Sequence, residues 1–417
     1  MFKTPSLPKI LISGAGITGL SLARLLQTKG IPFKLIEKRP RFKLGNRNTM
    51  FLHANEGTGI ALPANAVRAL RYMGLGAAIE RYAHPVNRII ATDPEGTVLN
   101  EASLLEPPLN IDRFVALHRH QLHTILCDGL IDTIQFDTYI EQLCHTHNGV
   151  LVKFNHSELP QEKFSAVIAA EGVYSHTRKL VFPANQLSDL GATIWRWTCS
   201  YPTENLQPTY MLGMRDLFMA YPIAKDEVYC YAHVCDPENS FAHNTDHHAD
   251  LAKIFGHYGG IAQKMLAILP CNSLINLGRL QSVQPLFTRR NIAFIGDAGH
   301  ACSPMLQQGA ASGFEDAIVL AELLKHFPIA EALQHYEQVR KERINWISAA
   351  SDGPLKMLIH ATPQSLLATH DKIRKEGPLN VIGWRKLLAE DPIKEIAHYI
   401  ATIQSADNTK SVGMTVK

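Results

Sequence analysis

Apolar residues near the start of the chain form two short runs with a helical pattern between them. Residues 10–12 (ILI) and 33–36 (FKLI) have the length and composition of buried strands. Leu20, Ala23 and Leu26 recur at the spacing of the buried face of a helix. The order strand, helix, strand predicts a βαβ unit, in which the two strands lie parallel in one sheet.

Similar patterns along the rest of the chain predict an α/β protein with a second, largely antiparallel part. Compact apolar runs at 166–170 and 292–295 predict further strands of the first sheet. From 189 to 284, strand-like segments alternate with polar turns, which is typical of an antiparallel sheet. Helical patterns return from 308 and precede a polar tail from 405. The other predicted elements are a hairpin over 87–101, a helix over 117–130, strands around 134–143 and 150–154, and a helix over 243–268.

Three glycines at the first strand–helix turn carry the strongest chemical signal. Gly14, Gly16 and Gly19 follow the first strand in GxGxxG spacing, and the second strand ends on Glu37. Gly14 allows the sharp turn, Gly16 lets bare backbone approach a pyrophosphate, and Gly19 allows close packing of helix and strand. The helix N-terminus faces the phosphates with unpaired N–H groups, and Glu37 would accept hydrogen bonds from a ribose diol. The pattern predicts a dinucleotide site.

Composition and charge argue against several other classes of protein. A net charge of +3 on 417 residues implies no nucleic-acid partner. The seven cysteines form no CxxC pair and suggest reduced thiols in a cytoplasmic protein. The first residues are too short and polar for a signal peptide, and no apolar run is long enough to span a bilayer. Twenty histidines include no HExxH or similar pattern, so we expect no metal site.

Three further motifs, far apart in the chain, extend the picture. They are Arg119 in HRHQLHTIL, the segment 169–178 (AAEGVYSHTR), and Gly296-Asp297 followed by Pro304 and Gly309. With the opening glycines, their order and spacing resemble the FAD-dependent aromatic hydroxylases of the para-hydroxybenzoate hydroxylase type, the class A flavoprotein monooxygenases. The resemblance runs from about residue 8 to about residue 350.

The resemblance implies a set of FAD-binding residues. Gly14, Gly16 and Gly19, with Ile17 and Thr18 between them, would hold the pyrophosphate, and Glu37 would bind the adenosine ribose beside Lys38. Arg119 would reach the pyrophosphate or ribityl chain, Ile140 would lie near the adenine, Asp297 would bind the ribityl hydroxyls, Pro304 would lie against the isoalloxazine, and Gly309 and Ala310 would face the flavin N1/O2 edge. The last placement also has a physical reason, because a helix N-terminus stabilises the negative charge of reduced flavin.

The implied fold is a Rossmann-like FAD-binding domain (GR2-type) with a second, mostly antiparallel β-sheet substrate domain and C-terminal helices. The FAD-binding domain would comprise residues 1–75, 111–185 and 286–350, the substrate domain 76–110 (a hairpin) and 186–285, and the C-terminal helical region 351–417.

The implied function is hydroxylation of a small aromatic or heteroaromatic substrate with NAD(P)H and O2, through a C4a-hydroperoxyflavin. NAD(P)H would dock only transiently, which agrees with the single GxGxxG. Arg196, Arg215, Tyr221, Tyr229 and His233 are candidates to face the substrate from the second sheet. Arg215 and Tyr229 are the favoured catalytic pair, because strand alternation would point both towards the flavin. The sequence leaves the substrate, NADH or NADPH, and monomer or homodimer open.

Three residues depart from the family pattern and keep other interpretations open. Glu171 replaces the usual Asp, Gln307 replaces the first glycine of Gly-Gln-Gly, and Ala311 replaces an Asn. The basic segment 38–57, which would lie over the cofactor phosphates or form a solvated loop, looks longer than usual. The alternatives are a flavin reductase or dehydrogenase on the same fold, such as a prenyl-lipid reductase, and a degenerate, non-catalytic FAD-binding protein. A nicotinamide dehydrogenase is weaker, since it would leave Gly296-Asp297 unexplained.

Overall fold

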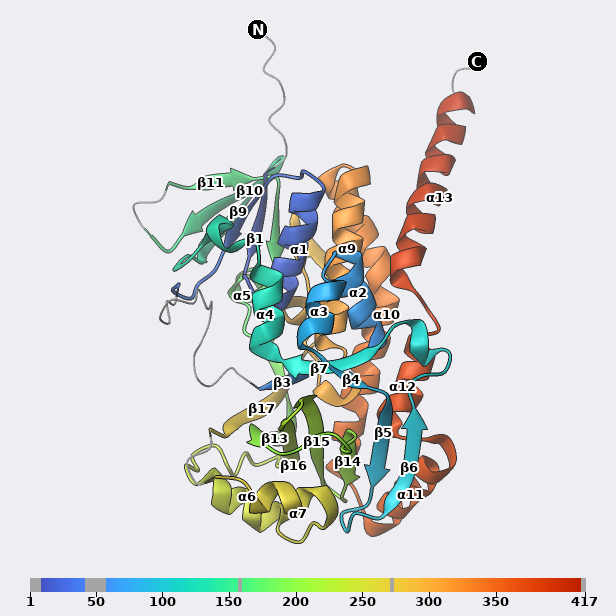
Figure 1. Cartoon of the computed structure of the whole chain (residues 1–417). Coiled ribbons are helices and arrows are strands. Elements are labelled where there is room, and N and C mark those ends of the chain that lie inside the picture. The colour runs from blue at the N-terminus through green and yellow to red at the C-terminus, as the bar shows by residue number, and fades with distance from the viewer. Residues whose placement is uncertain (1–8, 42–57, 157–159, 271–273, 414–417) are drawn as a thin grey trace.

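The computed structural model describes residues 9–41, 58–156, 160–270 and 274–413, and Figure 1 shows the whole chain. Most of the basic segment 38–57 therefore lies outside the described residues. The described chain forms two large sheets with helices packed on them, one above the other in the view of Figure 1. The predicted α/β fold, with an antiparallel second sheet and C-terminal helices, is confirmed.

A mostly parallel six-stranded sheet forms the first layer and contains the predicted βαβ unit. Its strand order is β18-β19-β12-β1-β2-β8. These strands are β1 Ile10–Ser13, β2 Phe33–Ile36, β8 Ile134–Gln135, β12 Ala166–Ala169, β18 Thr288–Arg289 and β19 Ile292–Phe294. β1 pairs in parallel with both β2 and β12, and only β18 runs antiparallel to its neighbour. The strands predicted at 166–170 and 292–295 thus join the first sheet, as expected.

Helices cover this sheet and bury its apolar side chains. They are α1 Ile17–Thr28, α2 Ala64–Tyr72, α3 Gly76–Tyr82, α4 Arg119–Cys127, α5 His176–Val181, α8 Asp297–His300, α9 Gly309–His326 and α10 Ile329–Leu358. Thr18 on α1 lies against Gly296 and Gly313, and a Cβ on either glycine would come within 2.4 Å of the Thr18 Oγ1 atom. This close approach fixes α1 against α9.

Two small sheets flank the first layer. One is the meander β11-β10-β9, built from β9 Ile140–Thr146, β10 Gly149–Phe154 and β11 Glu162–Phe164. The other has the order β3-β7-β4, with β3 Gly59–Leu62, β4 His84–Val86 and β7 Phe114–His118. The helix predicted over 117–130 begins only at Arg119, because β7 uses the preceding apolar residues as a buried strand.

The second layer is a seven-stranded sheet with two different faces. Its order is β17-β13-β16-β15-β14-β5-β6, with β5 Arg88–Thr92, β6 Val98–Ser103, β13 Leu187–Ser200, β14 Thr209–Leu212, β15 Asp216–Ala224, β16 Glu227–Cys235 and β17 Asn276–Val283. Only β14 and β5 pair in parallel. The outer face packs on α6 His247–Phe255 and α7 Gly260–Ala267, below the sheet in Figure 1. The inner face is turned towards the first layer.

Two helix predictions need correction. The helix predicted over 243–268 is two helices, separated at 256–259. The chain turns there because Gly259 packs on the 93–96 turn of the β5–β6 hairpin, where a Cβ would lie 2.3 Å from the Glu95 carbonyl oxygen. The predicted polar tail from 405 is helical as far as 413, because no proline or sharp turn interrupts the last helix.

The C-terminal region consists of α11 Pro363–Glu376, α12 Leu379–Leu387 and α13 Pro392–Gly413. Short 3-10 helices lie at Leu109–Ile111 (η1), Ile131–Thr133 (η2) and Pro304–Leu306 (η3). In Figure 1, α13 runs back along the first layer and extends past it. Within the described residues, no helix combines the length and apolarity needed to cross a membrane.

Candidate active site

The glycine turn between β1 and α1 has the geometry that its spacing predicts. Gly14 has a φ of +105°, and a Cβ there would lie 2.5 Å from the Ala170 carbonyl oxygen. A Cβ on Gly19 would lie 1.9 Å from the Gly14 carbonyl oxygen. Gly14 and Gly19 are therefore required by the fold itself. Gly16 is different, because its φ is −78° and a Cβ would meet nothing within 4 Å.

The open side of this turn is where a ligand would lie. In residues 10–23, all of which the structure describes, every residue is buried except Gly16, Ile17 and Thr18. In the described structure, no side chain caps the N-terminus of α1 and its first turn contains no acidic residue. The free N–H groups and the space at Gly16 together form a site for an anionic group.

Glu37 lies next to this turn and is already oriented. The backbone N–H groups of Ala15 and Arg39 donate to its two carboxylate oxygens, at 2.9 and 3.0 Å. Glu37 is only 8% exposed, whereas Lys38 beside it is exposed. A carboxylate can accept about four hydrogen bonds, so Glu37 keeps acceptor capacity for a diol.

The segment after β19 exposes the residues that the resemblance assigns to the flavin. In residues 292–324, all of which are described, only Asp297, Pro304 and Gly309 are exposed. A Cβ on Gly309 would lie 3.8 Å from Oδ1 of Asp297, so these two residues are neighbours. Ala310 follows in the first turn of α9, which has no side-chain cap in the described structure. We call residues 304–309 the flavin-facing loop, after the placement that the resemblance implies.

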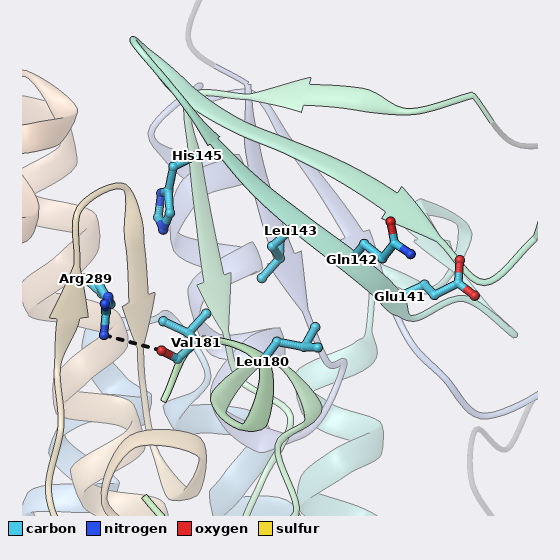
Figure 2. Close-up of a pocket in the computed structure, with 7 residues that line it drawn as sticks. All are labelled: Glu141, Gln142, Leu143, His145, Leu180, Val181 and Arg289. Atoms are coloured by element: carbon cyan, nitrogen blue, oxygen red, sulfur yellow. Dashed lines mark hydrogen bonds between the residues drawn. The ribbon is translucent and has the colours of Figure 1, made fainter. Parts of the chain in front are cut away.

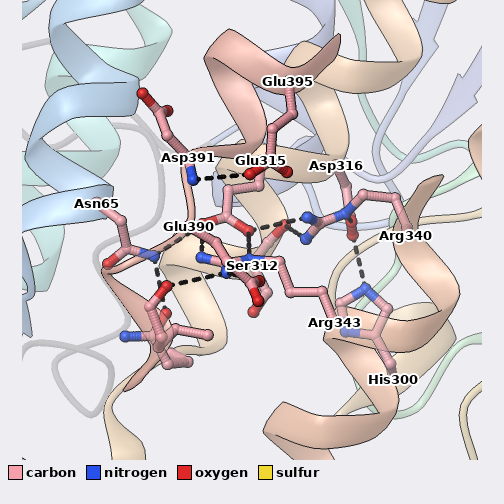
Figure 3. A network of polar contacts seen from close by, with 12 residues as sticks. Asn65, His300, Ser312, Glu315, Asp316, Arg340, Arg343, Glu390, Asp391 and Glu395 are labelled. Atoms are coloured by element: carbon pink, nitrogen blue, oxygen red, sulfur yellow. Dashed lines mark hydrogen bonds and ion pairs between the residues drawn. The ribbon is translucent and has the colours of Figure 1, made fainter. Parts of the chain in front are cut away.

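A buried polar network holds the start of this segment (Figure 3). Asp316 on α9 accepts the Gly296 N–H at 2.8 Å, and Nε2 of His300 lies 2.6 Å from the same oxygen. Arg340 on α10 donates to the other Asp316 oxygen at 2.8 Å. Burial alone would raise the pKa of Asp316, but His300 and Arg340 lower it to about 2. Asp316 is therefore an anion that fixes the Gly296 turn.

The same network holds the end of the loop. Glu315 accepts hydrogen bonds from Arg340 at 2.9 Å, from Arg343 at 2.9 and 3.0 Å, and from Asn65 at 2.8 Å. Asn65 also donates to Oε1 of Gln308 at 2.9 Å. Burial opposes ionisation of Glu315, but the two guanidinium groups lower its pKa to about 2. α2, α9 and α10 thus hold the Gln308 end of the loop as well.

Glu171 closes the site on the β12 side. Its carboxylate accepts from Ser13 Oγ at 2.6 Å, Ser175 Oγ at 2.6 Å, and both N and Oγ1 of Thr177 at 2.8 and 2.7 Å. These contacts join the end of β1 to the start of α5. Arg178 on α5 then donates to the Ala298 carbonyl at 2.9 Å, which connects this segment to α8. The substituted Glu171 is therefore integrated in the structure.

Arg119 and Ile140 lie at different depths. Arg119 is exposed at the start of α4, and its N–H donates to the Thr58 carbonyl at 2.9 Å. The preceding His118 contacts Glu227 of the β15–β16 turn at 2.8 Å, so this helix end touches the second sheet. Ile140 is fully buried in an apolar cluster at the start of β9.

The inner face of the second sheet carries the candidate substrate residues in rows. Arg196 pairs with Tyr231, and the next pairs along β16 are Tyr229 with Thr198 and His233 with Ile194. Tyr229 also pairs with Tyr221 of β15. Alternation therefore places Arg196, Tyr221, Tyr229 and His233 on one face, as expected.

Arg215 and Tyr229 are not brought together. Tyr229 lies opposite Tyr221 and under Gly59, where a Cβ would come 2.6 Å from the Tyr229 side chain. Arg215 precedes Tyr221 by six residues, which corresponds to about 20 Å along an extended strand. Its guanidinium lies 3.5 Å from the sulfur of Cys235 at the far end of the hairpin.

Several buried polar atoms on this face have no partner in the described structure. They are Arg196 Nε, the Tyr231 hydroxyl, both ring nitrogens of His233, and Arg215 Nε. Burial lowers the pKa of His233 to about 4, so its imidazole is neutral near pH 7. Unpaired buried donors and acceptors are costly, so a ligand or water must satisfy them. The inner face thus presents polar groups without partners in an apolar wall.

A separate groove lies beside the first layer (Figure 2). β9, α5 and β18 line it with Glu141, Gln142, Leu143, His145, Leu180, Val181 and Arg289. Arg289 lies at one edge of the groove, where its guanidinium donates to the Val181 carbonyl at 3.5 Å. The groove contains none of the residues predicted for the cofactor or the substrate.

Comparison with known proteins agrees with this geometry. The sequence profile of the FAD binding domain family matches residues 8–349. A curated relative, 2-heptyl-3-hydroxy-4(1H)-quinolone synthase of Pseudomonas aeruginosa, is 30% identical over 364 residues, covering 82% of this chain and 87% of the relative. The chain belongs to the family of FAD-dependent aromatic hydroxylases. Another relative, FAD-dependent urate hydroxylase of Klebsiella oxytoca, is 27% identical over 81% of this chain and 86% of its own length.

Solved structures of similar proteins support the fold of this chain. Klebsiella pneumoniae HpxO, complexed with FAD and uric acid, gives a TM-score of 0.81 at 24% identity, over 93% of this chain and 98% of that chain. A salicylate hydroxylase complex gives a TM-score of 0.75 at 19% identity, over 94% and 98%. Both likenesses concern the fold alone.

The cofactor of this chain is FAD, and the described residues fit it. The open space at Gly16 and the uncapped α1 suit a pyrophosphate, and Glu37 suits a ribose. In residues 292–324, all of which are described, Asp297, Pro304 and Gly309 are the only exposed residues, and the others are buried or half-buried. The helices α1 and α9 begin at the two ends of this surface, and each presents free N–H groups there.

Sequence reasoning missed the residues that hold these groups in place. No motif singled out Asn65, His300, Glu315 or Asp316. Arg340, which donates to both carboxylates, lies in a helix that the sequence pattern predicts. Tyr210 and Tyr231 on the inner face were also missed. For Tyr231, the period-two alternation with Tyr229 and His233 was the available signal. β14 carries none of the predicted candidates, so no such signal pointed to Tyr210.

Proposed function

We propose that this chain is an FAD-dependent monooxygenase that hydroxylates a small aromatic or heteroaromatic ring with NAD(P)H and O2. One contact carries the proposal. The amide of Gln307, in the flavin-facing loop, donates to the hydroxyl of Tyr210 on β14 at 2.7 Å. The surface assigned to the flavin and the inner face of the second sheet therefore meet, and a ring bound on that face would lie beside the flavin.

Bound FAD would supply the redox chemistry, in which NAD(P)H, a proton, O2 and the ring give NAD(P)+, water and the hydroxylated ring. The protein's own residues would bind the ring, orient it and exclude water. Leu217 and Met219 supply apolar wall on β15, in the same cluster as Tyr221, Tyr229 and Tyr231. An apolar wall of this kind excludes water and so limits side reactions of activated oxygen.

Polar groups on the same face would orient the ring. A neutral His233 offers one donor and one acceptor, and the guanidinium of Arg196 offers donors only. Burial raises the pKa of Tyr229 to about 12, against the opposing charge of Arg196, so its hydroxyl donates and does not serve as a base near pH 7. Because Arg215 lies about 20 Å from Tyr229 along the sheet, it would contact only a substrate long enough to span that distance.

The relatives suggest where to look for the substrate. Their names specify a 4(1H)-quinolone with a heptyl chain, urate, and 3-amino-4-hydroxybenzoate. A fused heteroaromatic ring with hydrogen-bonding groups on its edge would match the mixture of Arg196, Tyr231 and His233. The aliphatic part of the same face would accept an alkyl substituent.

The test begins with the absorbance spectrum of the purified protein and its change when NADPH or NADH is added under nitrogen. A panel of 4-quinolones with and without an alkyl chain, urate, salicylate and an aminohydroxybenzoate is then screened for faster flavin bleaching. The proposal expects one compound to accelerate bleaching, to drive O2 consumption in air, and to gain one oxygen atom by mass spectrometry.

Other outcomes separate the alternatives. Substrate-dependent bleaching without O2 consumption would identify a flavin reductase or dehydrogenase. A yellow protein that no pair of reductant and ring bleaches would identify a non-catalytic FAD-binding protein. That alternative rested on Glu171, Gln307 and Ala311, and each has a place in the structure. Glu171 is held by Ser13, Gln307 bonds Tyr210, and Ala311 fills the core.

A further inference from the structure

Gln307 has a backbone conformation that its residue type does not favour. Its φ is 54° and its ψ is 30°, in the left-handed region, between η3 and the start of α9. Glycine adopts this region without cost, and a long side chain does not. Glycine is also the residue that the family pattern has here. A glutamine at this point therefore needs a compensating interaction, which its side chain makes.

The compensating interaction crosses to the second sheet. Nε2 of Gln307 donates to the Tyr210 hydroxyl at 2.7 Å. The Tyr210 and Tyr221 rings lie edge to face with centroids 6.3 Å apart. Burial raises the pKa of Tyr221, and a hydrogen bond from Tyr210 opposes that rise. The Tyr210 oxygen accepts from Gln307, which leaves its own O–H able to donate to Tyr221.

This arrangement gives the hydrogen bonds a direction. The amide donates to Tyr210, whose O–H can then donate to Tyr221, and the proton of Tyr221 is left to donate onward. Tyr221 lies opposite Tyr229 on the inner face, in the surface assigned to the substrate. A three-residue chain thus runs from the flavin-facing loop to that surface.

Neighbouring residues of the loop are held by other elements. Trp384 on α12 donates to the Leu306 carbonyl at 2.9 Å, and Asn65 on α2 donates to the Gln308 side chain at 2.9 Å. Of the three consecutive residues 306–308, all described, Gln307 alone bonds a side chain of the second sheet. Within residues 306–308, this contact is therefore the hydrogen bond that ties the loop to a side chain of that sheet.

We propose that Gln307 is a positioning residue that sets the flavin-facing loop against the substrate sheet and orients the Tyr221 hydroxyl towards the substrate. The first half of the statement rests on FAD binding alone. The second half rests on the proposed monooxygenase function. Gln307 and Tyr210 act through this geometry and need not touch the reacting atoms.

The experiment compares Gln307→Gly and Tyr210→Phe with the double variant, each loaded with FAD. Gln307→Gly removes the bond and the backbone strain together, so its thermal midpoint should stay within about 2 °C of the parent. Tyr210→Phe removes only the hydroxyl. Arg290→Gly is the matched control, because Arg290 has a φ of 52° in the turn before β19. It relieves the same kind of strain away from the site.

The first readout is the visible absorbance and fluorescence of bound FAD. Both single variants should change it in the same direction, the double variant should equal either single one, and Arg290→Gly should match the parent. Unchanged flavin spectra in Gln307→Gly, or additive changes in the double variant, would overturn the proposal. This readout needs no substrate, so it separates failure here from failure of the proposed function.

The second readout applies to whichever ring the parent hydroxylates. Loss of one neutral hydrogen bond lowers kcat/KM about five-fold. We expect that loss in kcat, with KM nearly unchanged and more H2O2 released per NAD(P)H oxidised, in both single variants. A rise in KM with kcat unchanged, or an H2O2 release equal to that of the parent, would contradict the role of Gln307 in orienting Tyr221.

Discussion

Replacing Arg340 with Met tests the polar network behind the flavin-facing loop. Arg340 is completely buried, and Met fills a similar length without hydrogen-bond donors. Its guanidinium donates to Asp316 at 2.8 Å, to Glu315 at 2.9 Å and to the Ser312 carbonyl at 3.3 Å. The substitution leaves two buried carboxylates with less than their full set of partners.

The size of the effect follows from what remains. Breaking a buried ion pair by removing one partner costs about 3–5 kcal/mol. Glu315 keeps Arg343 and Asn65, and Asp316 keeps His300 and the Gly296 N–H. Because both carboxylates keep these partners, we expect a loss at the lower end of that range, about 3 kcal/mol of unfolding free energy.

The assay is urea unfolding at a fixed FAD concentration, followed by tryptophan emission, since bound ligand adds to apparent stability. Lys341→Met on the same helix is the control. Lys341 is 60% exposed and its Nζ lies 3.7 Å from Glu337, so its loss should change stability by less than about 0.5 kcal/mol. A loss below about 1 kcal/mol for Arg340→Met would refute the reasoning, because it would mean that these carboxylates do not depend on the pair.

Two further predictions concern the glycine turn and acid stability. Gly16→Ala should leave the FAD-free protein folded, as judged by circular dichroism, but should weaken FAD binding at least about ten-fold. Gly19→Ala should not fold, because its Cβ would lie 1.9 Å from the Gly14 carbonyl oxygen. Equal FAD affinity in Gly16→Ala would contradict a pyrophosphate at that position. The lowered pKa values of Glu315 and Asp316, both about 2, give stability that is complete above their ordinary values of 4.5 and 3.8 and is lost as pH falls towards 2. Thermal midpoints from pH 6 downwards should show this loss, and a shallower dependence is expected in Arg340→Met.

Local motifs made the turns and helix starts of the candidate cofactor site predictable. The spacing of Gly14, Gly16 and Gly19 determines a turn whose contacts lie within a few residues of one another or in the adjoining strand. Asp297 and Gly309 were equally accessible to sequence reasoning, because a strand end and a helix start are marked by local patterns. The α/β class followed from the same short-range periodicities.

The supporting contacts were not predictable, because they join distant segments. Asn65 and Glu315 are 250 residues apart in sequence, and no local pattern links them. On the second sheet, alternation identified the correct face but not the rows. Arg215 and Tyr229 share that face, yet their separation depends on the register of β15 and β16, which only the folded hairpin determines.

The Glu171 cluster has a consequence for how this chain can change over evolution. One carboxylate holds the hydroxyls of Ser13, Ser175 and Thr177, which come from the end of β1 and the start of α5. A shorter acid at 171 would not reach all three, and losing any hydroxyl would leave the carboxylate short of a donor. The four positions therefore constrain one another's substitutions. If aspartate replaced Glu171, the three hydroxyl residues would therefore be expected to change with it.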